Sequence, residues 1–224
     1  MLLDCQSISK MIKTELKQIK IIDLKYHPYK EVWAIQKEMQ NKRINGEIED
    51  TLFLVEHEPI FTLGKNADEN HLLPNRDQSV KVLNIDRGGD ITFHGPGQLI
   101  GYPILDLSNY EKSVTWYIRT LEQVVIDTLF EFDIDARRFE GLTGVWVKDA
   151  KISALGVRIK RWVTMHGFSI NVNTDLSYYS GIIPCGIFNY GVTSMKDQLY
   201  DLQDIEEVKK VLSNKFIQHF IQGK

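Results

Sequence analysis

Apolar residues recur at the spacing of an amphipathic helix in three parts of this sequence, residues 32–39, 114–132 and 205–220. Because an α-helix repeats every 3.6 residues, apolar positions three or four apart lie on one face. The long stripe at 114–132 is the most regular of the three. The pattern therefore predicts three helices, each with one face buried against a core.

Short apolar runs between these segments predict strands. They are residues 51–57, 81–87, 91–94, 99–107, 144–147, 151–160 and 167–173. Pro103 lies within one run, and because proline cannot donate a backbone hydrogen bond it predicts an edge position or a bulge there. Strands and helices alternate irregularly, without the βαβ period of a doubly wound fold. This order predicts an α+β fold, with a sheet and packed helices in one domain.

The length and net charge of the chain limit the classes of function that it can have. A chain of 224 residues suits one domain with a sizeable core. A formal net charge of −3 argues against nucleic acid as the main partner, since such proteins are usually basic. The first residues carry dispersed charges, and no apolar run approaches the ~18 residues of a membrane span. We expect a cytoplasmic protein without a membrane or nucleic-acid partner.

The two cysteines, Cys5 and Cys185, lie at opposite ends of the chain and form no CxxC spacing. This predicts neither a disulfide framework nor a zinc site. Cys185 stands in a turn, where it is either a small buried residue or a nucleophile. A nucleophilic thiol needs a neighbouring base or cation, and Lys151, at the start of an apolar strand, could serve. Sequence spacing alone does not bring the two together.

Residues 87–98 read RGGDITFHGPGQ. This is neither the GxxxxGK[ST] phosphate loop nor the GxGxxG of dinucleotide-binding proteins. Glycine allows a ligand to approach the backbone closely, but two tight turns would explain the same composition. His94, at the end of a predicted strand, is either a hydrogen-bonded structural residue or a polar group of a ligand site.

Two further patterns are weaker. EHEP (56–59) lacks the HExxH pairing of a metal-binding helix, so we expect no metal site. A set of basic residues forms either a solvated face or a dock for an acidic partner. Its members are Arg137, Arg138, Lys148, Arg158, Lys160 and Arg161.

The segment RGGDITFHGPGQLIGYPILDL (87–107) resembles the RGGxxTYHGPGQ motif of the lipoate-protein ligase B family, the octanoyl-[acyl-carrier-protein]:protein N-octanoyltransferases. VEHEPIFTLGK (55–65), the segment 151–173 and IIPCGI (182–187) resemble three other blocks of that family, in the same order. Phe93 departs from the usual tyrosine. Residues 1–24 look like an N-terminal extension, which leaves 25–224 as a single catalytic domain.

The resemblance implies a biotin/lipoate protein ligase-like (class II synthetase-like) fold, a mixed sheet with packed helices. It implies an acyltransferase of lipoate biosynthesis, with Cys185 as acyl-thioester nucleophile and Lys151 as its partner. The acyl substrate pocket would be lined by Arg87, Gly88, Gly89, Asp90, Ile91, Thr92, Phe93, His94, Ala154, Leu155, Gly156, Gly167, Phe168 and Ser169. We expect apolar side chains such as Leu155 and Phe168 to measure the length of the acyl chain.

The implied partners are octanoylated acyl carrier protein as donor, and as acceptors the lipoyl domains of 2-oxoacid dehydrogenase E2 subunits and the glycine cleavage H protein. We expect a monomer without a cofactor, because octanoyl-phosphopantetheine arrives on its carrier. Two alternatives remain. An ATP-dependent lipoate or biotin ligase of the same fold would act through an acyl-adenylate. A non-catalytic module would bind lipoyl domains or carrier proteins without a covalent intermediate.

Overall fold

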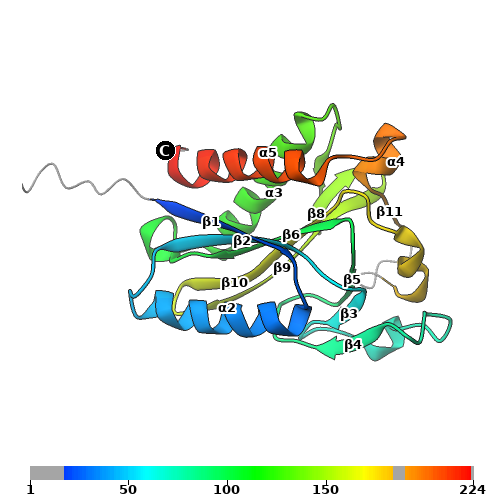
Figure 1. The fold of residues 1–224 in the computed structure, drawn as a ribbon, viewed down its shortest axis with the longest axis horizontal. Coiled ribbons are helices and arrows are strands. Elements are labelled where there is room, and N and C mark those ends of the chain that lie inside the picture. Colours follow the sequence, from blue (N-terminus) through cyan, green and yellow to red (C-terminus); the bar gives the residue numbers. More distant parts are fainter. Residues whose placement is uncertain (1–17, 184–189, 223–224) are drawn as a thin grey trace, which may run out of the picture.

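The computed structural model describes residues 18–183 and 190–222. Within these residues, a large mixed sheet lies between helices on its two faces, and a three-stranded sheet packs at one end (Figure 1). The large sheet has the spatial order β1-β2-β6-β10-β9-β8-β7, with β11 paired to β9. This confirms the predicted α+β class, in which an antiparallel-rich sheet carries packed helices.

The strands of the large sheet are β1 (Ile19–Tyr26), β2 (Asp50–Glu56), β6 (Gln98–Ile104), β7 (Arg137–Phe139), β8 (Leu142–Val147), β9 (Ala150–Lys160), β10 (Val163–Asn171) and β11 (Gly191–Val192). The small sheet contains β3 (Ile60–Leu63), β4 (Lys81–Asn84) and β5 (Ile91–His94), in the order β4-β3-β5.

The helices are α2 (Tyr29–Ile44), α3 (Val114–Phe130), α4 (Met195–Leu199) and α5 (Ile205–Ile217), which continues into the π-helical turn η5 (Gln218–Gln222). Short 3₁₀ turns are η1 (Glu69–His71), η2 (Leu107–Asn109) and η3 (Leu176–Gly181). The three helices predicted from periodicity are therefore present as α2, α3 and α5. No helix among the described residues is both long and apolar enough to cross a membrane.

Two cores lie on opposite faces of the large sheet. Successive side chains of a strand point to opposite faces, so in β2 Leu52 and Leu54 face α3 and α5, while Phe53 and Val55 face α2. Figure 1 shows α2 on one side of the sheet and α3 with α5 on the other. Burying one such side chain stabilises the fold by roughly 1.5–3 kcal/mol. Because both faces are covered, β2 reads as an almost unbroken apolar run.

The segment expected to be an N-terminal extension contributes to this sheet. β1 pairs in parallel with β2, from Ile19 opposite Asp50 to Asp23 opposite Leu54. Ile19 is buried in the core under α3 and α5. Residues 19–24 thus form most of an edge strand of the catalytic sheet.

Pro103 was expected at an edge position or a bulge, and because it lies in an interior strand the edge position is wrong. β6 runs between β2 and β10, and Pro103 stands opposite Leu52 of β2. On the other side, the ladder between β6 and β10 stops at Gly101–Phe168, and His166 of β10 has a φ of +60°. A Cβ on Gly167 would lie 2.7 Å from Cδ of Pro103. The ring is accommodated because the neighbouring strand leaves the ladder and has no side chain there.

Candidate active site

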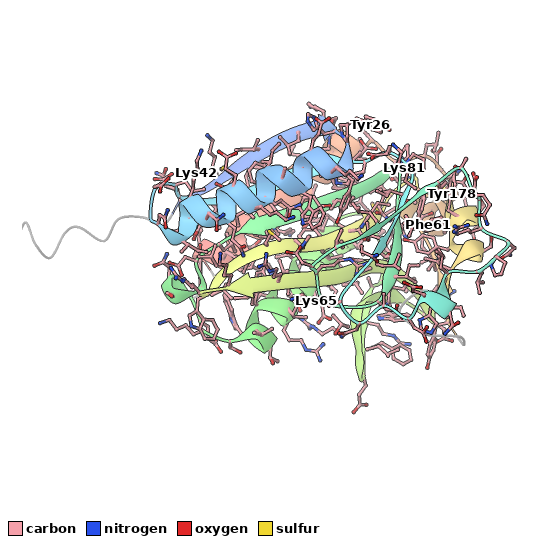
Figure 2. All side chains as sticks on the ribbon, turned by 90° about the horizontal axis from the view of Figure 1, so that it is seen from below. Tyr26, Lys42, Phe61, Lys65, Lys81 and Tyr178 are labelled. Carbon is pink, nitrogen blue, oxygen red and sulfur yellow. The ribbon has the colours of Figure 1, made fainter. Side chains whose placement is uncertain are left out.

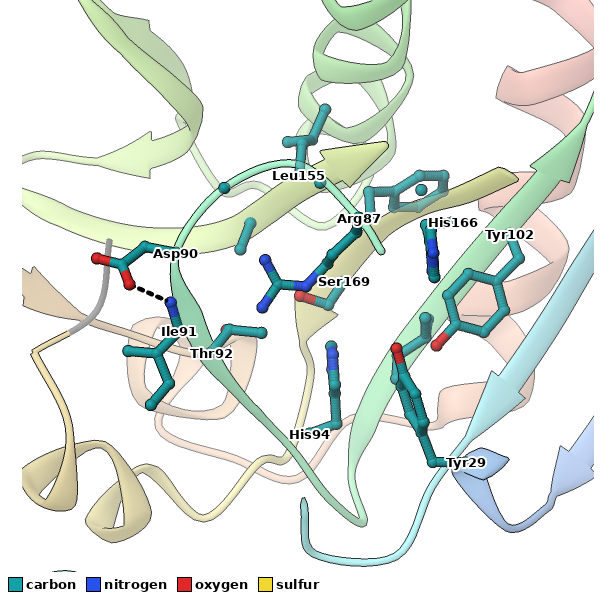
Figure 3. Close-up of a pocket in the computed structure, with 16 residues that line it drawn as sticks. Tyr29, Arg87, Asp90, Ile91, Thr92, His94, Tyr102, Leu155, His166 and Ser169 are labelled. Atoms are coloured by element: carbon teal, nitrogen blue, oxygen red, sulfur yellow. Dashed lines mark hydrogen bonds between the residues drawn. The ribbon is translucent and has the colours of Figure 1, made fainter. Parts of the chain in front are cut away.

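A pocket opens on the α2-facing side of the large sheet, between β9, β10 and the segment that leads into β5 (Figure 3). It is lined by Tyr29, Arg87, Gly89, Asp90, Ile91, Thr92, His94, Ile100, Tyr102, Ala154, Leu155, Gly156, His166, Gly167, Phe168 and Ser169. These residues come from α2, β5, β6, β9, β10 and the loop before β5. The predicted pocket segments, which are far apart in the sequence, therefore meet at one place.

The floor of the pocket is made of small residues on two paired strands. Ala154 pairs with Ser169, and Gly156 pairs with Gly167. A Cβ on Gly156 would lie 2.9 Å from the carbonyl oxygen of Gly88, and a Cβ on Gly167 would overlap the carbonyl oxygen of Gly101. Glycine is required at these two positions because other backbone approaches too closely for a side chain. The carbonyl groups of Gly88 and Gly101 therefore pack directly on these two glycines and hold the surrounding segments against the two strands.

Arg87 holds the RGG segment against the rest of the site. Its buried guanidinium donates from Nη2 to the carbonyl and hydroxyl oxygens of Thr62, at 2.7 and 3.0 Å, and from Nη1 to the carbonyl of Gly88 at 3.0 Å. The Gly88 N–H donates to the carbonyl of Val157 at 2.9 Å. Arg87 thus links the small sheet to β9 and forms one wall of the pocket.

Asp90 connects the pocket to the preceding turn. Its carboxylate accepts hydrogen bonds from the backbone N–H of Ile91 (2.8 Å) and Asp68 (3.2 Å), and pairs with Nδ1 of His71 at 2.5 Å. The backbone carbonyl of His71 in turn accepts from the N–H of Ile183 at 2.8 Å. The RGGD segment and the chain at Ile183 are therefore tied to the same short turn, η1.

His94 is part of a buried polar chain that crosses the sheet. Its Nδ1 donates to Oε1 of Gln98 at 2.7 Å, and Nε2 of Gln98 donates to Oδ1 of Asn171 at 2.9 Å. Asn171 donates to the carbonyl of Thr193 at 3.0 Å, and the Thr193 N–H donates to the carbonyl of Lys151 at 3.0 Å. Burial lowers the pKa of His94 to about 3, so its imidazole is neutral at neutral pH. Figure 3 shows the ring pointing into the pocket.

A second histidine lies behind the first. His57 donates from Nδ1 to the carbonyl of His27 at 2.6 Å, and its Nε2 accepts from the Tyr102 hydroxyl at 3.0 Å. Burial lowers its pKa to about 4. Tyr29 stacks on His94 with the ring centres 5.6 Å apart. Tyr29, Tyr102 and His166 line the pocket, and no motif in the sequence singled them out.

The EHEP motif is structural. Glu56 accepts from the N–H of Gly97 at 2.9 Å, which fixes the turn after β5, and Glu58 accepts from the N–H of Tyr29 at 3.0 Å, at the start of α2. A carboxylate at a helix N-terminus satisfies a backbone donor and complements the helix dipole. No cluster of three or more potential metal ligands occurs in residues 18–183 and 190–222.

Lys151 reaches the pocket face of the sheet through a β-bulge. Val145 of β8 stands opposite Ser153, but the next residue, Trp146, stands opposite Lys151, so Ile152 is the extra residue. Ile152 is buried in the core under α3 and α5. Lys151 therefore shares the face of Ala154, whereas strict alternation would have turned it to the opposite one.

Lys151 is buried against Trp146 and Gly144. The side chain is 7% exposed, and its Nζ lies 4.8 Å from the centre of the Trp146 ring. The Lys151 side chain runs across Gly144, where a Cβ would lie 3.1 Å from Cε. Gly144 has a φ of +133° and donates its N–H to the buried carboxylate of Glu122 at 3.0 Å.

Cys185 and Cys5 lie outside the described residues. The described chain resumes at Tyr190, whose ring packs on Trp146 with centres 5.5 Å apart. β11 then pairs in parallel with β9, so that Val192 stands opposite Lys151. The residues that follow the IIPCGI segment thus enter the sheet directly beside Lys151.

Two of the predicted pocket residues do not line the pocket. Gly88 and Phe93 are not among the lining residues, and Phe93 packs in the core of the small sheet, stacked on Tyr178 at 4.5 Å. Figure 2 shows Tyr178 beside Phe61, in the region of the small sheet. Leu155 and Phe168 line the pocket, but both side chains pack in the core under α3 and α5. Figure 3 shows Leu155 turned away from His94 and Tyr29. Leu155 and Phe168 both remain among the residues that line the pocket, and their contact with an acyl chain stays a prediction.

The basic residues do not form one free face. Arg158 pairs with Asp86 at 2.8 Å, Arg138 pairs with Glu122 at 3.1 Å, and Lys160 donates to Asn41 at 3.3 Å. Arg137 and Lys148 line a separate pocket together with Asp133, Asp135 and Asp149. Acidic neighbours therefore offset much of this positive charge.

Comparison with known proteins identifies the class. The lipoyl protein ligase A/B catalytic domain family matches residues 28–217. A bipartite lipoate protein ligase from Thermoplasma acidophilum superposes with a TM-score of 0.67 at 18% identity, covering 90% of this chain and 83% of that chain. A biotin protein ligase from Aquifex aeolicus superposes with a TM-score of 0.51 at 14% identity, covering 92% and 70%. The fold is thus that of the lipoate and biotin protein ligases, as expected.

Relatives with similar sequences narrow the family to proteins with one activity. An octanoyltransferase from Gloeobacter violaceus is 44% identical over 194 residues, which is 86% of each chain. An octanoyltransferase from Rubrobacter xylanophilus is 47% identical over 178 residues, covering 77% of this chain and 80% of the relative. The chain belongs to the lipoyl protein ligase A/B family and, within it, to the octanoyltransferases, which transfer octanoyl groups in lipoate biosynthesis.

Proposed function

We propose that the chain transfers an octanoyl group from the pantetheine thiol of an acyl carrier protein to a lysine of a lipoyl domain, through a thioester on Cys185. The observation that carries this proposal is the bulge at Ile152. It turns a buried lysine onto the face of a glycine-floored pocket, beside the strand that follows the Cys185 segment. A base and an acyl pocket on one face are what a thiol acyltransferase requires.

In the first half-reaction the Lys151 amine takes the proton of the Cys185 thiol, and the thiolate attacks the carbonyl carbon of the donor thioester. The carbon–sulfur bond to pantetheine breaks, and the leaving sulfur receives the proton from Lys151. In the second half-reaction the acceptor lysine attacks the new thioester while Lys151 takes a proton from its nitrogen. The Cys185 sulfur leaves and recovers a proton from Lys151.

The pocket described above would hold the acyl chain. Ala154, Gly156 and Gly167 are among the residues that line it. Each buried methylene group contributes about 0.8 kcal/mol, so an octanoyl chain offers several kcal/mol of binding. His94 and Tyr29 form the opposite wall.

Neither half-reaction needs ATP, because neither is uphill in free energy. Exchange of one thioester for another is close to balanced, and aminolysis of a thioester by a lysine is downhill. The cytoplasmic location, the monomeric state, and the choice among lipoyl domains of E2 subunits and the H protein stay predictions.

The test is a transfer assay with octanoyl-acyl carrier protein and a lipoyl domain, after residual ATP has been removed with hexokinase and glucose. Octanoylation of the lipoyl domain is the expected result. Octanoylation only from free octanoate with ATP would overturn the proposal in favour of a ligase. Binding of both proteins without any transfer would favour a non-catalytic module.

A further inference from the structure

His71 lies between two parts of the site that are far apart in the sequence. It is the last residue of η1, and both its side chain and its backbone make contacts outside that turn. Nδ1 of the imidazole lies 2.5 Å from Oδ2 of Asp90, which lines the pocket. The backbone carbonyl accepts from the N–H of Ile183 at 2.8 Å. One residue therefore contacts both the lining of the pocket and the chain that leads to Cys185.

The side-chain contact fixes η1 against the pocket wall. A carboxylate only accepts hydrogen bonds, so Nδ1 of His71 carries a proton and donates it to Asp90. The two side chains are 18% and 12% exposed, and a hydrogen bond to an ionised group is stronger than one between neutral groups. The other carboxylate oxygen accepts from the backbone N–H of Ile91 at 2.8 Å, a bond drawn in Figure 3. Asp90 therefore joins η1 to the start of β5.

Backbone contacts fix the chain on the other side of η1. Leu72 forms an antiparallel bridge with Ile182, and the Leu73 N–H donates to the carbonyl of Gly181 at 2.9 Å. With the bond between Ile183 and His71, these contacts hold residues 181–183 along the turn. The place of this short stretch is thus set by the place of η1.

The stretch ends close to Cys185 in the sequence. Cys185 follows Ile183 by two residues. Because two residues span at most about 7 Å even when fully extended, the Cα atom of Cys185 lies within that distance of the Cα atom of Ile183. A shift of η1 relative to the pocket therefore also shifts the point from which the Cys185 thiol reaches it.

We propose that His71 is a positioning residue, which aligns the Cys185 thiol with the acyl pocket through its contacts to Asp90 and Ile183. This inference rests on the proposed function, in which Cys185 carries the acyl group and the pocket holds its chain. Without the imidazole, η1 keeps its backbone bond to Ile183 but loses its side-chain bond to the pocket wall. A displacement of about 1 Å can slow a reaction by about 100-fold, so alignment of this kind has a large effect on rate.

The test compares two acyl chains, because poor alignment with the pocket affects only a chain long enough to occupy it. The single-turnover rate of Cys185 acylation is measured by intact mass with octanoyl- and butanoyl-acyl carrier protein. In His71→Ala we expect the octanoyl rate to fall at least about ten-fold and the butanoyl rate to fall less than about two-fold. Equal losses for the two chains would show a general structural effect, and unchanged rates would show no effect; either result would overturn the proposal.

A conservative variant supplies the second arm. Asparagine carries a side-chain N–H donor close to the position of Nδ1 in histidine. His71→Asn should therefore restore the octanoyl rate to within about three-fold of the wild-type rate. An asparagine variant as slow as the alanine variant would contradict the role assigned to this hydrogen bond.

The matched control is His219→Ala, which removes a similar pair elsewhere. Nε2 of His219 lies 2.6 Å from Oδ2 of Asp127, with side chains 24% and 34% exposed, and the pair joins η5 to α3. Figure 1 shows α3 and α5 on the face of the sheet opposite α2. Both acylation rates should equal those of the wild type. Failure of the proposed function would show separately, as an absence of acylation of the wild-type protein by either carrier.

Discussion

Lys151 stands directly opposite Trp146 in the pairing of β8 and β9, with its Nζ 4.8 Å from the centre of the indole ring. This contact with the indole ring holds the lysine side chain on this face of the sheet. The relationship exists only because Ile152 is an extra residue in β9. One bulge thus serves both the core, which receives Ile152, and the pocket face, which receives Lys151.

Replacing this lysine should remove catalysis and leave the fold intact. Lys151→Met keeps the length and apolar character of the side chain but cannot accept a proton. We expect kcat for octanoyl transfer to fall by at least about 100-fold, the contribution typical of general acid–base catalysis. Lys148→Met, at an exposed position on the same hairpin, should have wild-type kcat. Equal losses in both variants would contradict the role of Lys151.

The close approach of Gly156 to the RGG segment predicts that activity is sensitive to any side chain added at this position. In Gly156→Ala the new Cβ would lie 2.9 Å from the Gly88 carbonyl oxygen and 3.0 Å from Cδ of Arg87. The RGG segment must shift, so we expect at least a ten-fold loss of kcat/KM, with folding retained in thermal denaturation. Gly191→Ala makes only an ordinary contact, at 3.8 Å, and is the matched control. Unchanged activity in Gly156→Ala would show that the segment does not shape the pocket.

The buried histidines predict how stability varies with pH. Burial lowers the pKa of His57 to about 4 and that of His94 to about 3, from 6.5 in the unfolded chain. Between these values the unfolded state binds more protons, so stability is fully present above about pH 6.5 and falls as pH falls.

Between pH 7 and pH 5 the free energy of unfolding should decrease by roughly 2–4 kcal/mol, as measured by urea denaturation. His57→Gln should weaken this dependence. A stability that is level over this range would mean that the two imidazoles are not held neutral.

Glu122 is a buried carboxylate that joins α3 to β7 and β8. It accepts from Arg119 at 2.8 Å, from Arg138 at 3.1 Å and from the Gly144 N–H at 3.0 Å. Glu122→Ala leaves these donors unpaired and should lower the free energy of unfolding by about 3–5 kcal/mol.

Glu131, at the end of the same helix, pairs with Lys215 at a partly exposed position. Glu131→Ala should lower the free energy of unfolding by no more than about 1 kcal/mol. Similar losses in the two variants, measured by urea denaturation, would contradict the structural role assigned to Glu122.

Much of the fold could be predicted from the local pattern of apolar and polar residues. The stripe at 114–132 became α3 because its apolar residues repeat at helical spacing, and Ser113 caps that helix by accepting from the Trp116 N–H at 3.1 Å. β1 was missed because its alternation is weak and it lies before the first motif of the family. β3 was missed because IFTL is short and lies within a motif. The edge position expected from Pro103 was wrong because no local feature of the sequence shows that β10 leaves the hydrogen-bonded ladder opposite this residue.

The site was only partly predictable. Glycine, arginine and histidine in residues 87–94 stood out because their density is unusual, and the chain brings most of them to one pocket. Strict alternation would have placed Leu155 on the same face of β9 as Lys151, and the bulge at Ile152 reverses this. No glycine or proline marks that bulge in the sequence, so the orientation of Leu155 could not be predicted. Tyr102 was missed because it lies within a run that reads as an ordinary strand, and His166 was missed because it lies between two predicted strands, 151–160 and 167–173.

The most direct test of the account is the intact mass of the wild-type protein after brief incubation with octanoyl-acyl carrier protein in the absence of ATP, followed by peptide mapping. We expect one octanoyl adduct on Cys185, which disappears when a lipoyl domain is added and does not form in Cys185→Ser. No adduct in the wild type, or an adduct that persists in Cys185→Ser, would contradict the account.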